Sequence, residues 1–162
     1  MSAVDADRRR LVNVTLDGDA RVRRSREVEH ERAVAIFDLL EDNSFALVGD
    51  DRGPYSLHIA VRENRLVLDI RNGSEEPLET VTLALTPFRS VIRDYFTICE
   101  AYLDAIRTAS PSRIEAIDMG RRAMHDEGAA LLRERLAARI EMDDATLRRL
   151  FTLICVLHVR EW

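Results

Sequence analysis

The hydrophobic residues of this chain alternate with polar ones in four short segments and recur every three or four positions in the longer ones. The first alternating segment is LVNVTL, residues 11–16, which predicts a strand with Val12, Val14 and Leu16 on one face. Helical spacing follows after Ser25, a residue suited to cap a helix, and ends near Asn43. Its apolar positions are His30, Ala33, Ile36, Phe37 and Leu40.

A β-hairpin is the firmest prediction. YSLHIAVR and RLVLDIRN alternate on either side of Glu63-Asn64. Folding them about that turn places Leu57 opposite Ile70, Ile59 opposite Leu68 and Val61 opposite Leu66. A slip by one residue would send these side chains to opposite faces, so the pattern fixes the register. LETVTLALT then predicts another strand, with Val81, Leu83 and Leu85 facing inward.

The period becomes helical from Thr86 onward. Thr86 is expected to cap a helix with Pro87 at its first position, and Ser110-Pro111 repeats that signal for a helix reaching about Ile140. Asp143 or Asp144 is expected to cap the last helix. That helix is apolar almost all round, so we expect it to lie between the sheet and the other helices.

The order of elements is strand, helix, three strands and three helices, which predicts an α+β fold. We expect an antiparallel sheet of about four strands with helices packed on one face. The pattern leaves open which of the later strands lies beside the first. Residues 1–9 are predicted to be a disordered tail, and 10–162 a single α+β domain.

The amino-acid composition argues against two classes of function, nucleic-acid binding and membrane association. The net charge is −5, and every basic residue is an arginine, because the chain contains no lysine. Non-specific binding to nucleic acid is therefore not expected. The chain shows neither a signal peptide nor a long apolar run, so we expect a cytoplasmic protein that makes no membrane contact. Cys99 and Cys155 lie in apolar helical patterns and are expected to be buried, reduced thiols.

Four longer segments of the chain stand out: SREVEHERAVAIFDLLEDNSF, LTPFRSVIRDYFTICEAY, IEAIDMGRRAMHDEGAALLRERL and RRLFTLICVLH. Together they resemble uncharacterised protein family 0262, a group of alphaproteobacterial proteins. The resemblance extends from about Leu11 to Arg160. It implies a bacterial cytoplasmic protein, and it assigns no catalytic residue, cofactor or partner.

The stretch DMGRRAMHDEG is the main candidate site. Helical spacing puts Asp118, Arg121, Arg122 and His125 on one face, where the arginines and the histidine can grip a phosphate or carboxylate. The alternative is a solvent-exposed set of ion pairs, Asp118 with Arg122 and Arg122 with Asp126. For the two glycines of this stretch, Gly120 and Gly128, we favour close helix packing over a ligand.

The other candidates are weaker. Arg21, Arg23, Arg24 and Arg26 form either an anion clamp at a helix start or an exposed ion-pair network. That segment lacks aromatic residues for base stacking, so a nucleic-acid partner is not expected. Cys155 and His158 share a helical turn, with Cys99 a third residue that could lie nearby, but a zinc site needs four converging ligands, so no metal and no cofactor are predicted. We expect His30 to be part-buried and His58 to face the outer side of the sheet.

The sequence shows none of the glycine-rich or nucleophile motifs of P-loop, dinucleotide-binding or α/β-hydrolase proteins. No catalytic residues are predicted. The leading hypothesis is a small non-enzymatic protein-interaction or regulatory module that binds a protein partner or forms a homodimer. The alternative is a binder or enzyme for a small anionic metabolite that uses the 118–128 segment.

Overall fold

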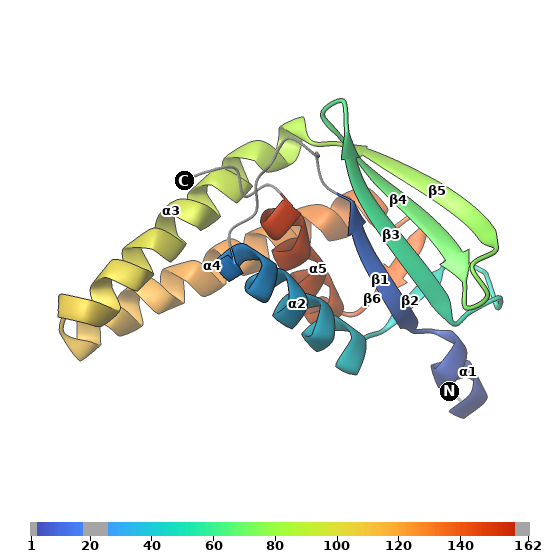
Figure 1. Cartoon of the computed structure of the whole chain (residues 1–162), viewed down its shortest axis with the longest axis horizontal. Coiled ribbons are helices and arrows are strands. Elements are labelled where there is room, and N and C mark those ends of the chain that lie inside the picture. The colour runs from blue at the N-terminus through green and yellow to red at the C-terminus, as the bar shows by residue number, and fades with distance from the viewer. Residues whose placement is uncertain (1–2, 18–25, 158–162) are drawn as a thin grey trace.

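A computed structural model describes residues 3–17 and 26–157 (Figure 1). The fold is α+β, as the sequence predicts. Its elements are α1 (Ala3–Arg8), β1 (Leu11–Asp17), α2 (Arg26–Glu41), β2 (Phe45–Leu47), β3 (Tyr55–Arg62), β4 (Arg65–Asn72), β5 (Pro77–Ala84), α3 (Thr86–Thr108), α4 (Pro111–Leu136), β6 (Ile140–Met142) and α5 (Asp144–Leu157).

The main sheet has the strand order β1-β3-β4-β5. The predicted hairpin is confirmed, because β3 and β4 pair with Leu57 opposite Ile70, Ile59 opposite Leu68 and Val61 opposite Leu66. The inward positions of β5 are also confirmed. The predicted inward residues, Val81 and Leu83 in β5 and Leu85 directly after it, are all buried.

The first strand departs from the prediction in two ways. β1 pairs with β3 in parallel, so the sheet is mostly rather than wholly antiparallel. The pairing register also shifts between Leu11 and Asn13, which turns Leu11 inward and leaves Val12 43% exposed. An irregularity of this kind adds one residue to the strand and so shifts the alternation of inward and outward side chains. A prediction that assumes regular alternation therefore places Val12 on the wrong face of the sheet.

Two short strands were not predicted. β2 and β6 form a separate antiparallel pair, in which Phe45 lies opposite Met142 and Leu47 opposite Ile140. α4 consequently ends at Leu136 rather than at about Ile140. Segments of three residues are too short to show a period, which is why the pattern merged β6 with the preceding helix.

The N-terminal elements differ from expectation as well. Residues 3–8, which were expected to lie in a disordered tail, form α1. In α2, His30 and Phe37 are exposed, whereas Leu39 is fully buried and Ile36 is half-buried. The buried face of α2 is therefore rotated from the predicted one, because α2 packs against α5 through the side that carries Leu39.

Within the described residues, helix caps follow the sequence at two of three places. Ser25, the expected cap of the helix after the first strand, lies outside them. The Ser110 hydroxyl accepts a hydrogen bond from the Arg113 amide, and the Asp143 carboxylate accepts one from the Thr146 amide at 2.8 Å. Thr86 is not the cap of α3. Leu85 holds that position without a side-chain bond, and the Thr86 hydroxyl instead accepts from the Asn64 side chain at 3.1 Å.

The last helix lies at the centre, as predicted. Figure 1 shows α2, α3, α4 and α5 on one side of the main sheet, and α5 packs against both α2 and α4. Among the described residues, no helix is long and apolar enough to cross a membrane. The buried residues of α5 are Thr146, Leu147, Leu150, Phe151, Leu153, Ile154 and Cys155.

Candidate functional site

A cavity of about 570 Å³ opens between α2, α3, α4 and α5. Apolar groups make up most of its wall, among them Val34 from α2, Phe96 and Leu103 from α3, and Val156 from α5. Ligand pockets in proteins commonly enclose about 300–1,000 Å³ and combine apolar walls with a few polar groups. The size and lining of this cavity therefore suit a small organic molecule.

Arg121 is the predicted site residue that lines this cavity. Its Nε and one terminal nitrogen donate to the same oxygen of Asp118, at 3.1 and 2.6 Å. Its guanidinium carbon lies 4.6 Å from the centre of the Tyr102 ring. At this distance the face of the aromatic ring attracts the positive charge of the guanidinium. The bond from Arg121 also lowers the pKa of Asp118, so the carboxylate that orients Arg121 stays ionised.

Arg122 takes a different position. Its guanidinium reaches the second oxygen of Asp118 at 3.1 Å, but its side chain is 76% exposed and lies outside the cavity wall. The predicted pair of Arg122 with Asp126 does not form; Asp126 lies 3.7 Å from Arg148 instead. One carboxylate thus holds two arginines, of which only Arg121 faces the cavity.

His125 is half-buried and is not one of the residues that line the cavity. Its ring stacks on Tyr95, with centroids 5.2 Å apart and planes 2° from parallel. Thr152 donates its hydroxyl proton to the Arg148 carbonyl, so it accepts from His125 Nε2 at 2.6 Å. Burial, together with the positive charge of Arg121, lowers the pKa of His125. At neutral pH the ring is therefore uncharged, and it supports Tyr95 and Thr152, both of which line the cavity.

The two glycines of the segment serve helix packing. A side-chain carbon at Gly120 would lie 2.6 Å from the terminal carbon of Ile98 in α3. At Gly128 it would overlap three atoms of the Phe151 ring in α5. The absence of a side chain lets α4 approach both neighbours, as favoured from the sequence.

Sequence reasoning missed the parts of the cavity that other helices supply. The sequence pattern does not single out Tyr95, Tyr102 or Thr152 as site residues, yet all three line the cavity. Thr152 was detectable as a polar residue within the apolar last helix. Its meeting with His125 across 27 positions of the chain was not, because no local pattern reports which helices touch.

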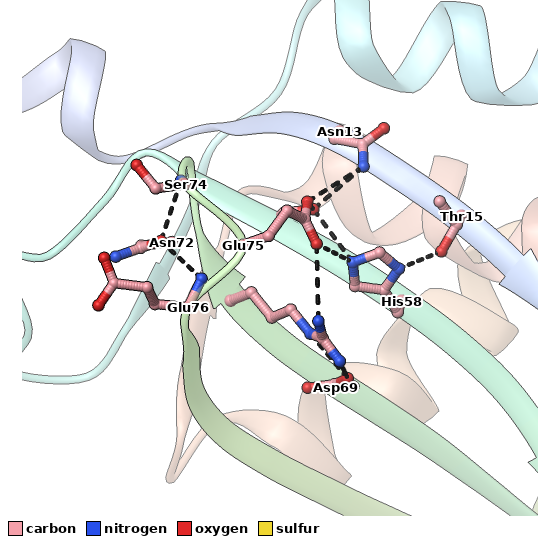
Figure 2. A network of polar contacts seen from close by, with 10 residues as sticks. Asn13, Thr15, His58, Asp69, Asn72, Ser74, Glu75 and Glu76 are labelled. Carbon is pink, nitrogen blue, oxygen red and sulfur yellow. Dashed lines mark hydrogen bonds and ion pairs between the residues drawn. The ribbon is translucent and has the colours of Figure 1, made fainter.

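A second polar cluster lies on the outer face of the main sheet, where His58 was expected to point (Figure 2). Glu75, in the turn between β4 and β5, accepts hydrogen bonds from the Ser56 hydroxyl at 2.6 Å and from His58 Nε2 at 2.7 Å. The other ring nitrogen of His58 meets the Thr15 hydroxyl. This cluster ties β1, β3 and the turn together on the face opposite the helices.

The remaining candidates are not brought together. Arg21, Arg23 and Arg24 lie outside the described residues, as do the side chain of Arg26 and the whole of His158. Within the described ranges, no three His, Cys, Asp or Glu side chains are arranged to hold a metal ion. Cys155 is buried, and burial raises the pKa of its thiol, so it behaves as an apolar group.

Comparison with known proteins identifies relatives over almost the whole chain. The chain is 58% identical over 150 residues to a UPF0262 protein of Rhodospirillum rubrum, covering 93% of this chain and 92% of that protein. It is 60% identical over 151 residues to one from Azorhizobium caulinodans, covering 92% and 93%. It is 56% identical over 153 residues to one from Paramagnetospirillum magneticum, covering 94% and 98%.

No solved structure gives a significant match to this fold. The sequence profile described as "Uncharacterised protein family (UPF0262)" matches residues 8–160. With this match and the three relatives, the resemblance noted in the sequence is confirmed, and the chain belongs to UPF0262.

Proposed function

We propose that this protein is a non-enzymatic binding module whose ligand is a small apolar molecule carrying a single carboxylate. The observation that carries the proposal is the guanidinium of Arg121 in the wall of a largely apolar cavity. We place this activity in the cytoplasm, in line with the sequence.

The geometry of Arg121 supports a carboxylate ligand. The edge formed by Nε and one terminal nitrogen is held by Asp118, which leaves the edge between the two terminal nitrogens for a ligand. That edge can bind both oxygens of a carboxylate. The Tyr102 ring and Asp118 fix the guanidinium beforehand, so little side-chain entropy is lost on binding.

The other charges around the cavity limit the ligand to one negative charge. Asp38 of α2 and Glu100 of α3 also line the wall. Their carboxylates repel polyanions such as nucleotides, whereas a monocarboxylate can turn its charged end to Arg121 and its apolar body to Phe96 and Leu103. His125 adds no positive charge, because its ring is neutral at neutral pH.

The proposal is tested by thermal shift and calorimetry with decanoate, using decanol as the uncharged control. Decanoate is expected to raise the melting temperature and decanol to bind more weakly. Arg121→Met should weaken decanoate binding by about 10- to 100-fold, the worth of one hydrogen bond to a charged group. Arg122→Met is the matched control and should bind as the wild type does. Equal loss in both variants, or no shift with decanoate, would contradict the proposal.

A second candidate function is association with another copy of the chain. One observation favours it: large apolar side chains are exposed on α2 and α3, with Phe37 at 64% and Leu103, in the cavity wall, at 58%. Val34 and Ile106 extend the same faces of α2 and α3. Light scattering across a concentration series distinguishes the two candidates. A dimer that Phe37→Glu dissociates would support association, since Phe37 lies outside the cavity lining, and a monomer throughout would oppose it.

A further inference from the structure

The outer face of the main sheet carries three polar side chains linked in series, Thr15, His58 and Glu75 (Figure 2). Thr15 of β1 and His58 of β3 lie directly opposite each other in the parallel register. Glu75 adopts a positive φ of 64°, and its carboxylate reaches over β3 from the turn. A positive φ is costly for glutamate, and such strain concentrates at functional sites.

The positions of the protons follow from these contacts. The bonds from Ser56 and His58 lower the pKa of Glu75, so its carboxylate is ionised and can only accept. The Ser56 hydroxyl donates to one oxygen and His58 Nε2 donates to the other. With Nε2 donating to Glu75, the tautomer that fits both contacts leaves a lone pair on Nδ1, which accepts the hydroxyl proton of Thr15.

This is the order of groups found in serine hydrolases: a carboxylate fixes the tautomer of a histidine, whose free nitrogen faces a hydroxyl. In this protein Nε2 contacts the carboxylate and Nδ1 contacts the hydroxyl, which is the reverse of the arrangement in the serine-protease triad. Thr15 is exposed on the sheet face, so a reagent can reach its oxygen. We propose that Thr15 is a nucleophile that accepts an acyl group from a small, uncharged activated ester or thioester. This activity is independent of the cavity.

The reaction moves the acyl group from the donor to Thr15 and moves the hydroxyl proton of Thr15, through His58, to the leaving group. Thr15 Oγ1 attacks the carbonyl carbon of the donor while its proton passes to His58 Nδ1. The tetrahedral intermediate then expels the alkoxide or thiolate, which takes that proton from Nδ1. The products are an ester of Thr15 and the free alcohol or thiol. Glu75 acts as a positioning residue, since it holds the ring and stabilises its transient positive charge.

The surrounding charges favour an uncharged acyl donor over a phosphoryl donor. Asp69 lies opposite His58 on β4, and Glu75 adds a second negative charge. The nearby cation, Arg71, donates to Asp69 at 2.8 Å and lies 3.9 Å from Glu75. Because these carboxylates already compensate Arg71, a phosphate would meet net negative charge, and phosphoryl transfer depends on cations at the reacting group.

The test is acetylation of the full chain by p-nitrophenyl acetate, followed by intact and peptide mass spectrometry. The absence of lysine removes the usual competing side chain. We expect one acetyl group on Thr15, retained in Thr15→Ser and lost in Thr15→Val. Thr82→Val is the matched control, because Thr82 is an exposed threonine on the same sheet that lies in the far edge strand β5, away from His58. It should react as the wild type does.

The pH profile separates a reactive site from a structural network. His58→Gln should slow acetylation of Thr15 by about 100-fold, the usual contribution of a positioned base. It should also abolish the rise in rate with pH. In Glu75→Gln the amide can donate to Nε2 and reverse the tautomer, so the rate should fall about tenfold or more. Acetylation elsewhere with Thr15 unmodified, or equal rates in wild type and His58→Gln, would overturn the proposal.

Discussion

At the scale of single residues, Gly120 and Gly128 make different demands although both lie in α4. Alanine at either position should gain about 1 kcal/mol in helix propensity. At Gly128 the added methyl overlaps the fully buried ring of Phe151, and overpacking of this kind costs about 1–3 kcal/mol or more. At Gly120 it meets only the flexible end of the half-buried Ile98 side chain, which can move away.

We therefore expect Gly128→Ala to lower the free energy of unfolding by about 1–2 kcal/mol. Gly120→Ala should leave it within about 0.5 kcal/mol of the wild type or raise it slightly. Urea denaturation followed by circular dichroism measures both. If the two variants lost equal stability, the difference drawn here between a rigid and a flexible neighbour would be wrong.

His125 makes stability depend on pH in a defined direction. Its pKa is lower in the folded protein than the ordinary value of 6.5, so the unfolded chain binds the proton more tightly. Its contribution to stability is complete above about pH 6.5 and is lost as the pH falls through the lowered value. The free energy of unfolding should thus decrease from pH 7.5 to 5.5, by at most about 1.4 kcal/mol per pH unit for one proton.

The variant His125→Phe keeps a ring against Tyr95 and removes the titration. Its free energy of unfolding should vary less with pH over this range than that of the wild type. Glu75 does not confuse the result, because its pKa is lowered from 4.5 and its effect lies at more acidic pH. An identical slope in the two proteins would show that His125 is not responsible.

The candidate site shows how far residue spacing can be taken. Helical spacing correctly grouped Asp118, Arg121 and Arg122, and both arginines contact the one carboxylate. Helical spacing did not show that Arg121 lines the cavity and Arg122 does not. That difference depends on α3, whose Tyr102 ring contacts the guanidinium of Arg121. Nor did the spacing show that His125 is desolvated, since that depends on Tyr95 and Phe151 from two other helices.

At the scale of elements, the turn of the hairpin offers a stabilising change. Glu63 and Asn64 both have positive φ, 50° and 62°, as in the type I′ turn of two-residue hairpins. Asparagine tolerates this conformation, whereas for other L-residues it costs roughly 1–2 kcal/mol. Glu63→Asn should therefore raise the free energy of unfolding by about 0.5–1 kcal/mol. Thermal and urea denaturation of the variant measure this gain.

The matched control is Glu75→Asn. Glu75 also has a positive φ, but its carboxylate holds Ser56 and His58, and the shorter asparagine side chain cannot reach both. We expect no gain in stability from this variant despite the easier backbone. If Glu75→Asn stabilised the protein as much as Glu63→Asn, the polar cluster on the sheet would make no contribution to the free energy of unfolding.

Elements were predictable where a period ran long enough to be counted. The eight-residue strands of the hairpin gave their register, and the Ser110-Pro111 pair gave the start of α4. The direction of β1 was not encoded locally, because a parallel pair forms only after α2 has carried the chain back. The buried face of α2 was misplaced for a similar reason, since exposed Phe37 is as apolar as buried Leu39.

At the scale of the whole molecule, the helical hairpin of α3 and α4 is packed unevenly. Near the sheet, Phe88 and Ile92 of α3 and Leu132 and Leu136 of α4 are buried. Toward the loop between the helices, the exposed residues include Leu103, Ile106 and Met119. Figure 1 shows these far ends extending away from the sheet. The half near the sheet is thus held by the core, and the far half mainly by the contact between its two helices.

Hydrogen exchange should report this division. We expect amides of residues 98–122 to exchange by local opening, faster than those of α5, of the β3–β4 hairpin and of residues 128–136, because local stability follows buried apolar contact. A bound monocarboxylate would slow exchange around Tyr102 and Arg121 at any protein concentration, since it contacts both helices there. Association of two chains would instead slow exchange around Phe37 and Ile106 only as the protein concentration rises. Full protection of residues 98–122 in a dilute, ligand-free monomer would contradict the uneven packing, because it would show that the far half is as stable as the core without any occupant.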